Sequence, residues 1–502
     1  MNSEIGNFIG ASVRRTSLLI LLLLGTGMPP ALHANGGRHT RLFEPSPCPK
    51  ALPAGIRVDC GFLVVPENSR DNDEGPSWSS HKEIRIAVAI ARASSGVALP
   101  DPIVFVPGGP SAAAIDPGTI FVLSSLFGAN RDVVFVDARG TGLSQPRLGC
   151  PEFDALAVAA FPNAPPRAAY LASVRQCRDR LRAAGVDLDA YDSAANAEDL
   201  DDLRVTLGYD RWNVLGLSNG GLATLTLMRL HPEGIRSVVL DSPTSNDNLW
   251  VVDRWRTANR LLEKVFADCA ADSACDRQFP GLRSVFYGLI DALRQNPVDV
   301  SVPNPTGGPD ITAHVTGDAF LAATARLIQN PAVLPSLPAT IFFAAHGGLA
   351  PVVRAAVGAP TPLSDVLAYG KTLSTLCSDI IPFETPHDRT EAARAIPEFS
   401  TLILDPDALA PINRQACTVW GVPRAPAVQH HPLRLRIPTL ILSGDYDGVV
   451  SPEEGERIAA SLRRAVFHQV PGAGHVVLTG TCASGIASRF LDDPEPVPDT
   501  SC

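Results

Sequence analysis

The chain has 502 residues, of which 45% are hydrophobic and 19% are charged, and its formal net charge at pH 7 is −10. This much apolar material can bury a large core, which excludes a disordered or coiled-coil chain. No clustered basic face is visible, so nucleic acid is excluded as an expected partner. The length favours more than one structural unit.

The first 34 residues have the pattern of a secretory signal peptide. Arg14 and Arg15 precede an apolar run at residues 18–24, and small residues end the segment at 31–34. This order is typical of an export signal, and the run is too short to span a bilayer comfortably. We therefore predict export to the periplasm or beyond, with no stable membrane association after cleavage. An uncleaved anchor remains an alternative, and the arginine pair weakly favours twin-arginine export.

Ten cysteines follow this segment, and no Cys-x-x-Cys motif occurs among them. An even number of cysteines behind a signal peptide indicates disulfides formed in an oxidising compartment. The spacings do not suit a tetrahedral zinc site, and metalloprotease and phosphate-loop motifs are absent, so we expect no metal and no organic cofactor. Pairing neighbours along the chain, so that each bond closes a local loop, predicts Cys48–Cys60, Cys150–Cys177, Cys269–Cys275, Cys377–Cys417 and Cys482–Cys502.

The first part of the mature chain is rich in predicted strands. Residues 35–56 are polar and proline-rich and are expected to form an exposed lead-in. Strands are then predicted at 61–66 and 83–90, followed by two runs at 103–106 and 133–136 that are apolar on both faces. Strands of that second kind suit a parallel sheet covered by helices.

Helix and strand patterns alternate after this. A helix is predicted at 193–207, a strand at 212–217, a helix at 220–230 and a strand at 237–240. Such alternation is the signature of an α/β fold with a mostly parallel sheet.

The pattern becomes helical in the middle of the chain and returns to strands near its end. Helices are predicted at 254–270, 282–294 and 319–328, and strands resume at 438–444. We interpret residues 35–245 and 433–502 as two parts of one α/β core, and residues 246–432 as a mainly helical cap inserted between late strands.

Residues 216–220, Gly-Leu-Ser-Asn-Gly, fit the G-x-S-x-G nucleophile elbow, with a predicted strand before them and a helix after them. Glycines beside the serine let the backbones pass closely at the tight turn, which presents the hydroxyl at the edge of the sheet. Ser218 is therefore the candidate nucleophile. The N–H groups that open the following helix can stabilise an oxyanion.

A serine nucleophile needs a base that is oriented by a third group. In α/β-hydrolases the order along the chain is serine, acid, histidine. The loop after the resumed strand offers Asp445 and Asp447, and a later glycine-rich loop ends in His475. We favour Asp447 as the acid and assign Asp445 a structural role. His475 is the candidate base.

A second oxyanion donor is expected in the loop after an early strand. Residues 106–110, Val-Pro-Gly-Gly-Pro, provide such a loop. We predict the backbone N–H groups of Gly109 and Asn219 as the two donors.

These motifs resemble proline iminopeptidases and secreted tripeptidyl aminopeptidases, over about residues 48–482. The resemblance rests on Pro-Gly-Gly-Pro at 107–110, Asp-Ala-Arg-Gly-Thr-Gly at 137–142, the elbow, the acid and histidine loops, and Cys-Thr-Val-Trp at 417–420. It implies an α/β-hydrolase fold whose triad carries over to Ser218, Asp447 and His475. Two positions depart from the family: Ser111 replaces a usual glycine, and Asn219 replaces a common tyrosine or tryptophan.

The resemblance implies an aminopeptidase that releases N-terminal residues or short peptides through an acyl-enzyme. A carboxylesterase acting on small esters with the same triad is the second hypothesis. A non-catalytic binding protein on the same scaffold is the third, although this chain retains all three triad residues. The sequence does not indicate an oligomeric state.

Overall fold

The computed structural model describes residues 42–48, 52–68, 82–154, 156, 167–304, 308–357, 367–405, 412–495 and 500–501. The predicted signal peptide, residues 1–34, lies outside this range. Among the described residues, no helix has both the length and the apolar character that crossing a membrane requires.

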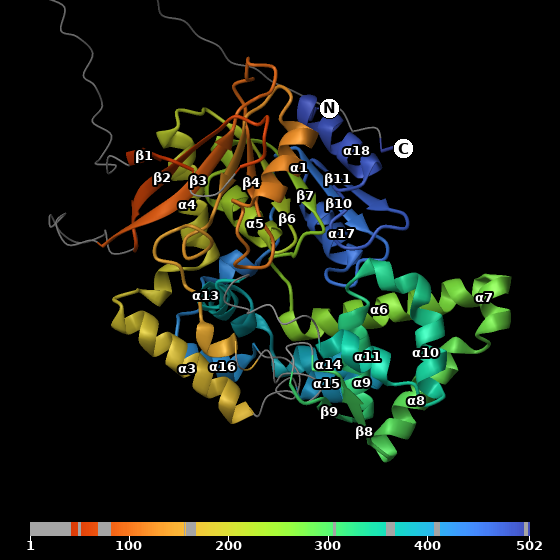
Figure 1. Ribbon diagram of the computed structural model, residues 1–502. Coiled ribbons are helices and arrows are strands. Elements are labelled where there is room, and N and C mark those ends of the chain that lie inside the picture. Colours follow the sequence, from red (N-terminus) through yellow and green to blue (C-terminus); the bar gives the residue numbers. More distant parts are fainter. Residues whose placement is uncertain are drawn as a thin grey trace, which may run out of the picture. The chain divides into compact units, whose positions relative to one another are not determined.

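The core is a nine-stranded sheet with the strand order β1–β2–β3–β5–β4–β6–β7–β10–β11 (Figure 1). The pairs from β1 to β5 are antiparallel, and the strands from β5 to β11 are parallel. The bounds are β1 (Leu42–Ser46), β2 (Val58–Pro66), β3 (Glu83–Ala91), β4 (Ile103–Val106), β5 (Val133–Val136), β6 (Trp212–Leu217), β7 (Ile235–Asp241), β10 (Thr439–Gly444) and β11 (Ala465–Val470).

The α/β class predicted from the sequence is therefore the observed fold, and each predicted strand lies within an observed strand or within one residue of it. One strand of this sheet was not predicted. The stretch expected to be an exposed lead-in contains β1, which pairs along its length with β2. Its side chains are exposed or partly buried, so an edge strand formed there without an apolar pattern to reveal it.

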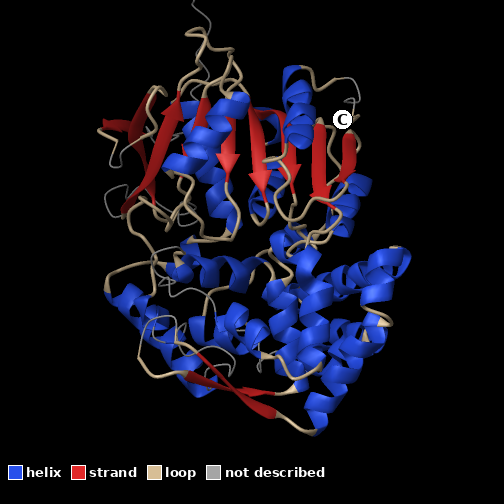
Figure 2. Ribbon diagram, turned by 45° about the vertical axis from the view of Figure 1, so that its right-hand side comes forward, coloured by secondary structure: helices blue, strands red, loops and turns tan. Residues whose placement is uncertain are grey.

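Helices cover both faces of the sheet (Figure 2). Alternate residues of β4 point to opposite faces, so Ile103 and Phe105 join one core cluster, and Val104 and Val106 join the other. The first cluster is completed by α1 (Pro117–Phe127) and α18 (Thr481–Asp492), and the second by α4 (Ser193–Thr206), α5 (Gly220–Leu230) and α17 (Pro452–Ser461).

The chain between β7 and β10 is mainly helical and has a core of its own, which includes Trp255, Phe286 and Phe320. It also contains the antiparallel pair β8 (Val298–Val302) and β9 (Ile311–Val315), which we had not predicted. The helices are α6 (Trp250–Ala271), α7 (Ser273–Gln278), α8 (Leu282–Gln295), α9 (Gly317–Leu327), α10 (Leu337–Ala345), α11 (Ala350–Val357), α13 (Tyr369–Asp379), α14 (Pro386–Ala395), α15 (Ser400–Leu404) and α16 (Arg414–Trp420). We refer to these elements as the cap elements.

A further helix, α3 (Arg167–Ala183), packs with cap elements although it precedes β6 in the chain. Tyr170 and Leu181 of α3 share a buried cluster with Leu373 of α13 and Trp420 of α16. Residues assigned by sequence to the first part of the core therefore also contribute to the packing of α13 and α16.

Four of the predicted disulfides are confirmed: Cys48–Cys60, Cys150–Cys177, Cys269–Cys275 and Cys377–Cys417. The fifth predicted pair includes Cys502, which lies outside the described residues.

Candidate active site

Ser218 lies at the turn between β6 and α5, where its backbone has a φ of 55°. A positive φ is uncommon for a residue with a side chain and marks a constrained position. The neighbouring glycines make the turn possible. A Cβ at Gly216 would lie 2.4 Å from Thr224 Oγ1, and one at Gly220 would lie 2.3 Å from the carbonyl oxygen of Val106. The elbow predicted from the sequence therefore has a steric basis in the fold.

The structure brings the three predicted triad residues together at the carboxyl ends of β6, β10 and β11. His475 Nε2 lies 3.0 Å from Ser218 Oγ, and His475 Nδ1 lies 2.7 Å from Asp447 Oδ2. The Asp447 side chain is fully buried and that of His475 is 16% exposed. A carboxylate only accepts hydrogen bonds, so this contact fixes a proton on Nδ1 and leaves Nε2 free to accept the serine proton.

The acid loop is held from two sides. The other oxygen of Asp447 accepts from the N–H groups of Val449 and Val450 at 2.8 and 2.9 Å. From the cap, Arg260 of α6 donates to the carbonyl oxygens of Asp445 and Asp447. The Asp445 side chain lies 3.6 Å from Lys264, so of the two candidate acids it is Asp447 that contacts His475.

The loop that carries Gly109 packs directly against the nucleophile. A Cβ at Gly108 would lie 2.7 Å from the Cβ of Ser218, and Gly109 has a φ of 40°. Asn219 begins α5 with helical backbone angles. Both predicted oxyanion donors thus belong to backbone segments that adjoin Ser218, and their role remains a prediction.

Asp137, which we had not predicted as a site residue, holds the Gly109 loop through hydrogen bonds to its backbone. It follows β5 and is fully buried. One oxygen accepts from the N–H groups of Ala114 and Ile115 at 2.7 and 2.9 Å, and the other accepts from Leu143 at 2.7 Å. A single carboxylate therefore ties the Gly109 loop to the loop after β5.

Asp241, at the end of β7, does the same for the histidine loop. Its two oxygens each accept at 3.0 Å from the N–H groups of Val477 and Leu478, while its carbonyl oxygen accepts from the N–H of Ser218 at 2.8 Å. Burial raises the pKa of the Asp241 carboxyl, and the hydrogen bonds from Val477 and Leu478 oppose that rise. Asp241 therefore links the nucleophile turn to the histidine loop.

Two further constrained residues accompany Asp241. Ser242 and Val476 have φ values of 50° and 67°, and the N–H of Val476 donates to Ser242 Oγ at 3.2 Å. Together with Ser218, they are the non-glycine residues with positive φ in the described part of the chain. Backbone strain is thus concentrated around the triad, as is common at functional sites.

The two departures from the family both have structural contexts. The hydroxyl of Ser111 lies 2.6 Å from Thr372 Oγ1 of α13, so it connects the Gly109 loop to the cap. The Asn219 side chain is 8% exposed, and its amide nitrogen has no hydrogen-bond partner among the described residues.

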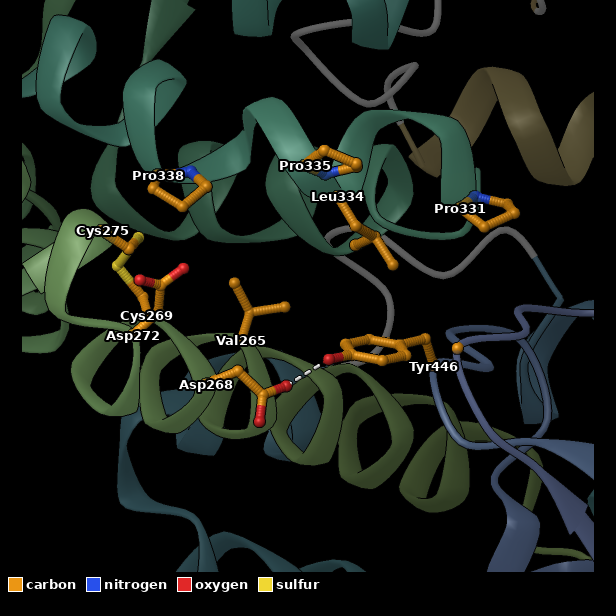
Figure 3. A pocket seen from close by; sticks show the side chains of 11 residues that line it. Val265, Asp268, Cys269, Asp272, Cys275, Pro331, Leu334, Pro335, Pro338 and Tyr446 are labelled. Carbon is orange, nitrogen blue, oxygen red and sulfur yellow. Dashed lines mark hydrogen bonds between the residues drawn. A yellow bond between two sulfur atoms is a disulfide. The ribbon is translucent and has the colours of Figure 1, made fainter.

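A pocket of about 330 Å³ borders the loops of the acid and the histidine (Figure 3). Tyr446 and Gly472 form its edge on the core side, and Asp268 of α6 accepts a hydrogen bond from the Tyr446 hydroxyl. Prolines line the opposite wall, at Pro331, Pro335 and Pro338.

Groups of side chains with metal-ligand chemistry occur twice in the described part of the chain, and neither contains a triad residue. In one group, Cys150 and Cys177 are joined in a disulfide. The other group consists of Asp201, His231 and Glu233, in which His231 lies 3.4 Å from Asp201; His231 also lies 3.1 Å from Glu198, outside the group. His231 is thereby surrounded by carboxylates, which raise its pKa.

Comparison with known families assigns this fold and its C-terminal segment. Residues 101–308 match the alpha/beta hydrolase fold family, and residues 407–502, which contain the acid and histidine loops, match the family described as TAP-like protein. The chain therefore has the α/β-hydrolase fold and carries a C-terminal segment of the TAP-like kind. Its reaction class is therefore hydrolysis.

Individual relatives of this α/β-hydrolase are distant. Serine protease Hip1 of Mycobacterium tuberculosis is 22% identical over 88% of both chains. Tripeptidyl aminopeptidase of Streptomyces coelicolor is 28% identical over 38% of this chain and 37% of its own. Among solved structures, a thermophilic esterase from Thermogutta terrifontis aligns over 82% of this chain and 95% of its own, with 16% identity and a TM-score of 0.35.

Proposed function

We propose that this protein is a serine hydrolase, and specifically an exported aminopeptidase that releases N-terminal residues or short peptides through an acyl-enzyme. The observation that carries the proposal is the hydrogen-bonded row from Asp447 through His475 to Ser218. The relatives named serine protease and tripeptidyl aminopeptidase favour peptides over simple esters as substrates. The predicted signal peptide and the disulfides support export.

In the proposed mechanism, Ser218 Oγ attacks the scissile carbonyl carbon while His475 Nε2 takes its proton. The new oxyanion accepts hydrogen bonds from the N–H groups of Gly109 and Asn219. His475 returns the proton to the leaving amine, which departs and leaves an ester on Ser218. His475 then takes a proton from water as the water attacks this ester, and it returns that proton to Ser218 Oγ as the carboxylic acid product leaves. Asp447 stabilises the imidazolium at both stages.

Labelling with a fluorophosphonate probe tests the nucleophile. We expect the mature protein to be labelled, and Ser218→Ala to lose both the label and about 10⁴-fold or more of kcat. Ser125→Ala, on the exposed side of α1, is the matched control and should keep both. Labelling that persists in Ser218→Ala would remove the nucleophile assignment, and a wild-type protein that neither labels nor hydrolyses would instead be a binding protein.

The choice between peptidase and esterase rests on substrate profiling. We expect turnover of aminoacyl or tripeptidyl anilides with a free N-terminus, and weaker turnover of the same anilides when the amine is blocked. Short-chain nitrophenyl esters serve as the second substrate class. A preference for these esters with no turnover of any anilide would make the protein a carboxylesterase.

A further inference from the structure

The Gly109 loop forms a tight turn directly after its predicted oxyanion donor. The carbonyl oxygen of Gly109 accepts from the N–H of Ala112 at 2.9 Å, so Pro110 and Ser111 occupy the two central positions of a β-turn. Gly109 itself has a φ of 40°. Because the turn is short and closed by a hydrogen bond, the position of Ser111 constrains the backbone of Gly109.

A cap helix holds the side chain of Ser111. Ser111 is 2% exposed, and its Oγ lies 2.6 Å from Oγ1 of Thr372 on α13, which is 6% exposed. Within the described part of the chain, each of these two hydroxyls is the hydrogen-bond partner of the other. The glycine that the family usually has at this position would lack the contact, so the link is a property of this chain.

α13 gives this contact a fixed support, because the whole helix is buried and bonded to the core. The N–H of Gly370 donates to the carbonyl oxygen of Leu148 at 2.8 Å. The Lys371 ammonium donates to the carbonyl oxygen of Tyr191 at 2.8 Å and to Asn196 Oδ1 at 3.1 Å. These bonds come from the residues immediately before Thr372, so the Thr372 hydroxyl has a defined place relative to the sheet.

The same part of the cap adjoins both segments that carry the predicted oxyanion donors. Leu367, which precedes α13, has its Cδ2 4.0 Å from the position of a Cβ at Gly109. Leu222, in the first turn of α5, shares a buried cluster with Leu373 of α13. The N–H of Leu222 donates to the carbonyl oxygen of Asn219 at 3.1 Å. α13 is therefore placed to keep the two donor segments in register.

The far end of the Gly109 loop has a separate restraint. Asp137 accepts from the N–H groups of Ala114 and Ile115, which lie beyond the turn. Ser111 is a central residue of the turn itself. Of these two restraints, the bond to Thr372 is the one closer to the oxyanion donor.

We propose that Thr372 is a positioning residue, which holds the Gly109 N–H toward the oxyanion through its hydrogen bond to Ser111. The inference rests on the proposed hydrolase function and on the oxyanion role of Gly109. An oxyanion donor acts mainly on the transition state, where the negative charge has formed, so the contact should contribute to kcat more than to KM. The position of a cap helix would thereby set the efficiency of the chemistry.

A double-variant cycle tests this coupling. Thr372→Val and Ser111→Ala should each lower kcat by about 10- to 100-fold, with KM within about threefold of the wild type. The double variant should lose no more than either single variant, because both substitutions break the same bond. The Ki of a trifluoromethyl ketone substrate analogue, which forms an oxyanion on Ser218, should rise by the factor by which kcat/KM falls.

Thr375→Val is the matched control. Thr375 is buried on the same helix, but its hydroxyl donates to the carbonyl oxygen of Tyr191 at 3.2 Å instead of to the Gly109 loop. This variant should lower the Tm as Thr372→Val does and keep the wild-type kcat. Thr372→Ser retains the hydroxyl and should keep most of kcat. Exhaustive fluorophosphonate labelling counts the active sites, so that kcat refers to folded molecules alone.

Three results would overturn the proposal: a kcat that is unchanged in Ser111→Ala, losses that multiply in the double variant, or an equal loss in Thr375→Val. If Thr372→Val does not fold, Ser111→Ala and Thr372→Ser decide the question, since the first should lose kcat and the second should not. A wild type that neither labels nor hydrolyses any substrate would instead remove the hydrolase function beneath the proposal.

Discussion

Two groups of buried carboxylates in this molecule differ in what satisfies them. At the sheet edge, Asp137, Asp241 and Asp447 accept hydrogen bonds mainly from backbone N–H groups of loops. Elsewhere, Asp199 pairs with Arg139 and Asp201 pairs with Arg204, side chain to side chain. The first kind fixes the path of a loop, and the second kind neutralises a charge that the fold has buried. We expect substitutions in the first group to act on catalysis and substitutions in the second to act on stability.

The largest effect should come from breaking the ion pair of Arg139. This side chain is 2% exposed and donates to both oxygens of Asp199, at 2.6 and 2.7 Å. Arg139→Met leaves an unpaired buried carboxylate, so we expect the free energy of unfolding to fall by about 3–5 kcal/mol. Denaturant unfolding measures this loss, while kcat of the molecules that remain folded should stay near wild type.

The double variant Arg139→Met with Asp199→Asn distinguishes charge from packing. If the stranded charge causes the loss, the double variant should be more stable than Arg139→Met alone. A double variant that is no more stable would show that the guanidinium acts through packing and through its bonds to the carbonyl oxygens of Glu67 and Ala190.

Asp241→Asn should have the next largest effect, and mainly on catalysis. The amide can accept from one of the two N–H groups of Val477 and Leu478 but presents a donor to the other. The histidine loop should therefore shift, and kcat should fall about 100-fold, with a smaller loss of stability of about 1–3 kcal/mol. Steady-state kinetics and a thermal melt measure the two. Asp210→Asn, whose side chain is 98% exposed in the wild type, is the control, and an unaltered kcat in Asp241→Asn would contradict this role.

Glu454 should give the smallest effect, and one that depends on pH. This buried residue of α17 accepts from the N–H of Ser245 at 3.0 Å. Burial and the neighbouring Asp253 raise the pKa of Glu454 to about 7, from an ordinary value of 4.5. The folded chain therefore holds a proton that the unfolded chain releases between these values, so the free energy of unfolding falls as pH rises through this window.

Glu454→Gln removes this titration. We expect the variant to be more stable than the wild type by about 1–2 kcal/mol near pH 8, and the two to converge below about pH 4.5. Thermal melts across this range measure the difference. A stability difference that does not change with pH would assign the effect of Glu454 to its hydrogen bonds alone.

Much of the fold and of the triad could be predicted from the sequence, because the strands and the nucleophile elbow leave strong local patterns. The runs at 103–106 and 133–136 are apolar throughout. The turn at Ser218 requires glycine at positions 216 and 220, because a Cβ there would clash with neighbouring atoms. Asp447 and His475 could be placed because the order of the triad along the chain is fixed in this fold.

The supporting residues left no signal of their role, although Asp137 begins one of the motifs that carry the family resemblance. Asp137 and Asp241 each stand at the end of a buried strand, where an aspartate is usually a turn former, and their partners belong to other loops. The β8–β9 pair was missed although residues 298–302, Val-Asp-Val-Ser-Val, alternate apolar and polar side chains as a strand does. The run is only five residues long, and the helical patterns around it dominated the interpretation of this segment.

The strand order has a consequence for how such proteins diversify. The long insertion leaves the sheet after β7 and returns to it at β10, and these two strands are neighbours bonded to each other, with the N–H of Val238 donating to the carbonyl oxygen of Pro438. The chain therefore leaves the sheet and re-enters it at adjacent positions, so the insertion can be replaced without changing the order of the strands. Replacing it would leave every strand of the sheet in place, which lets lineages acquire new substrate preferences without rebuilding the chemistry.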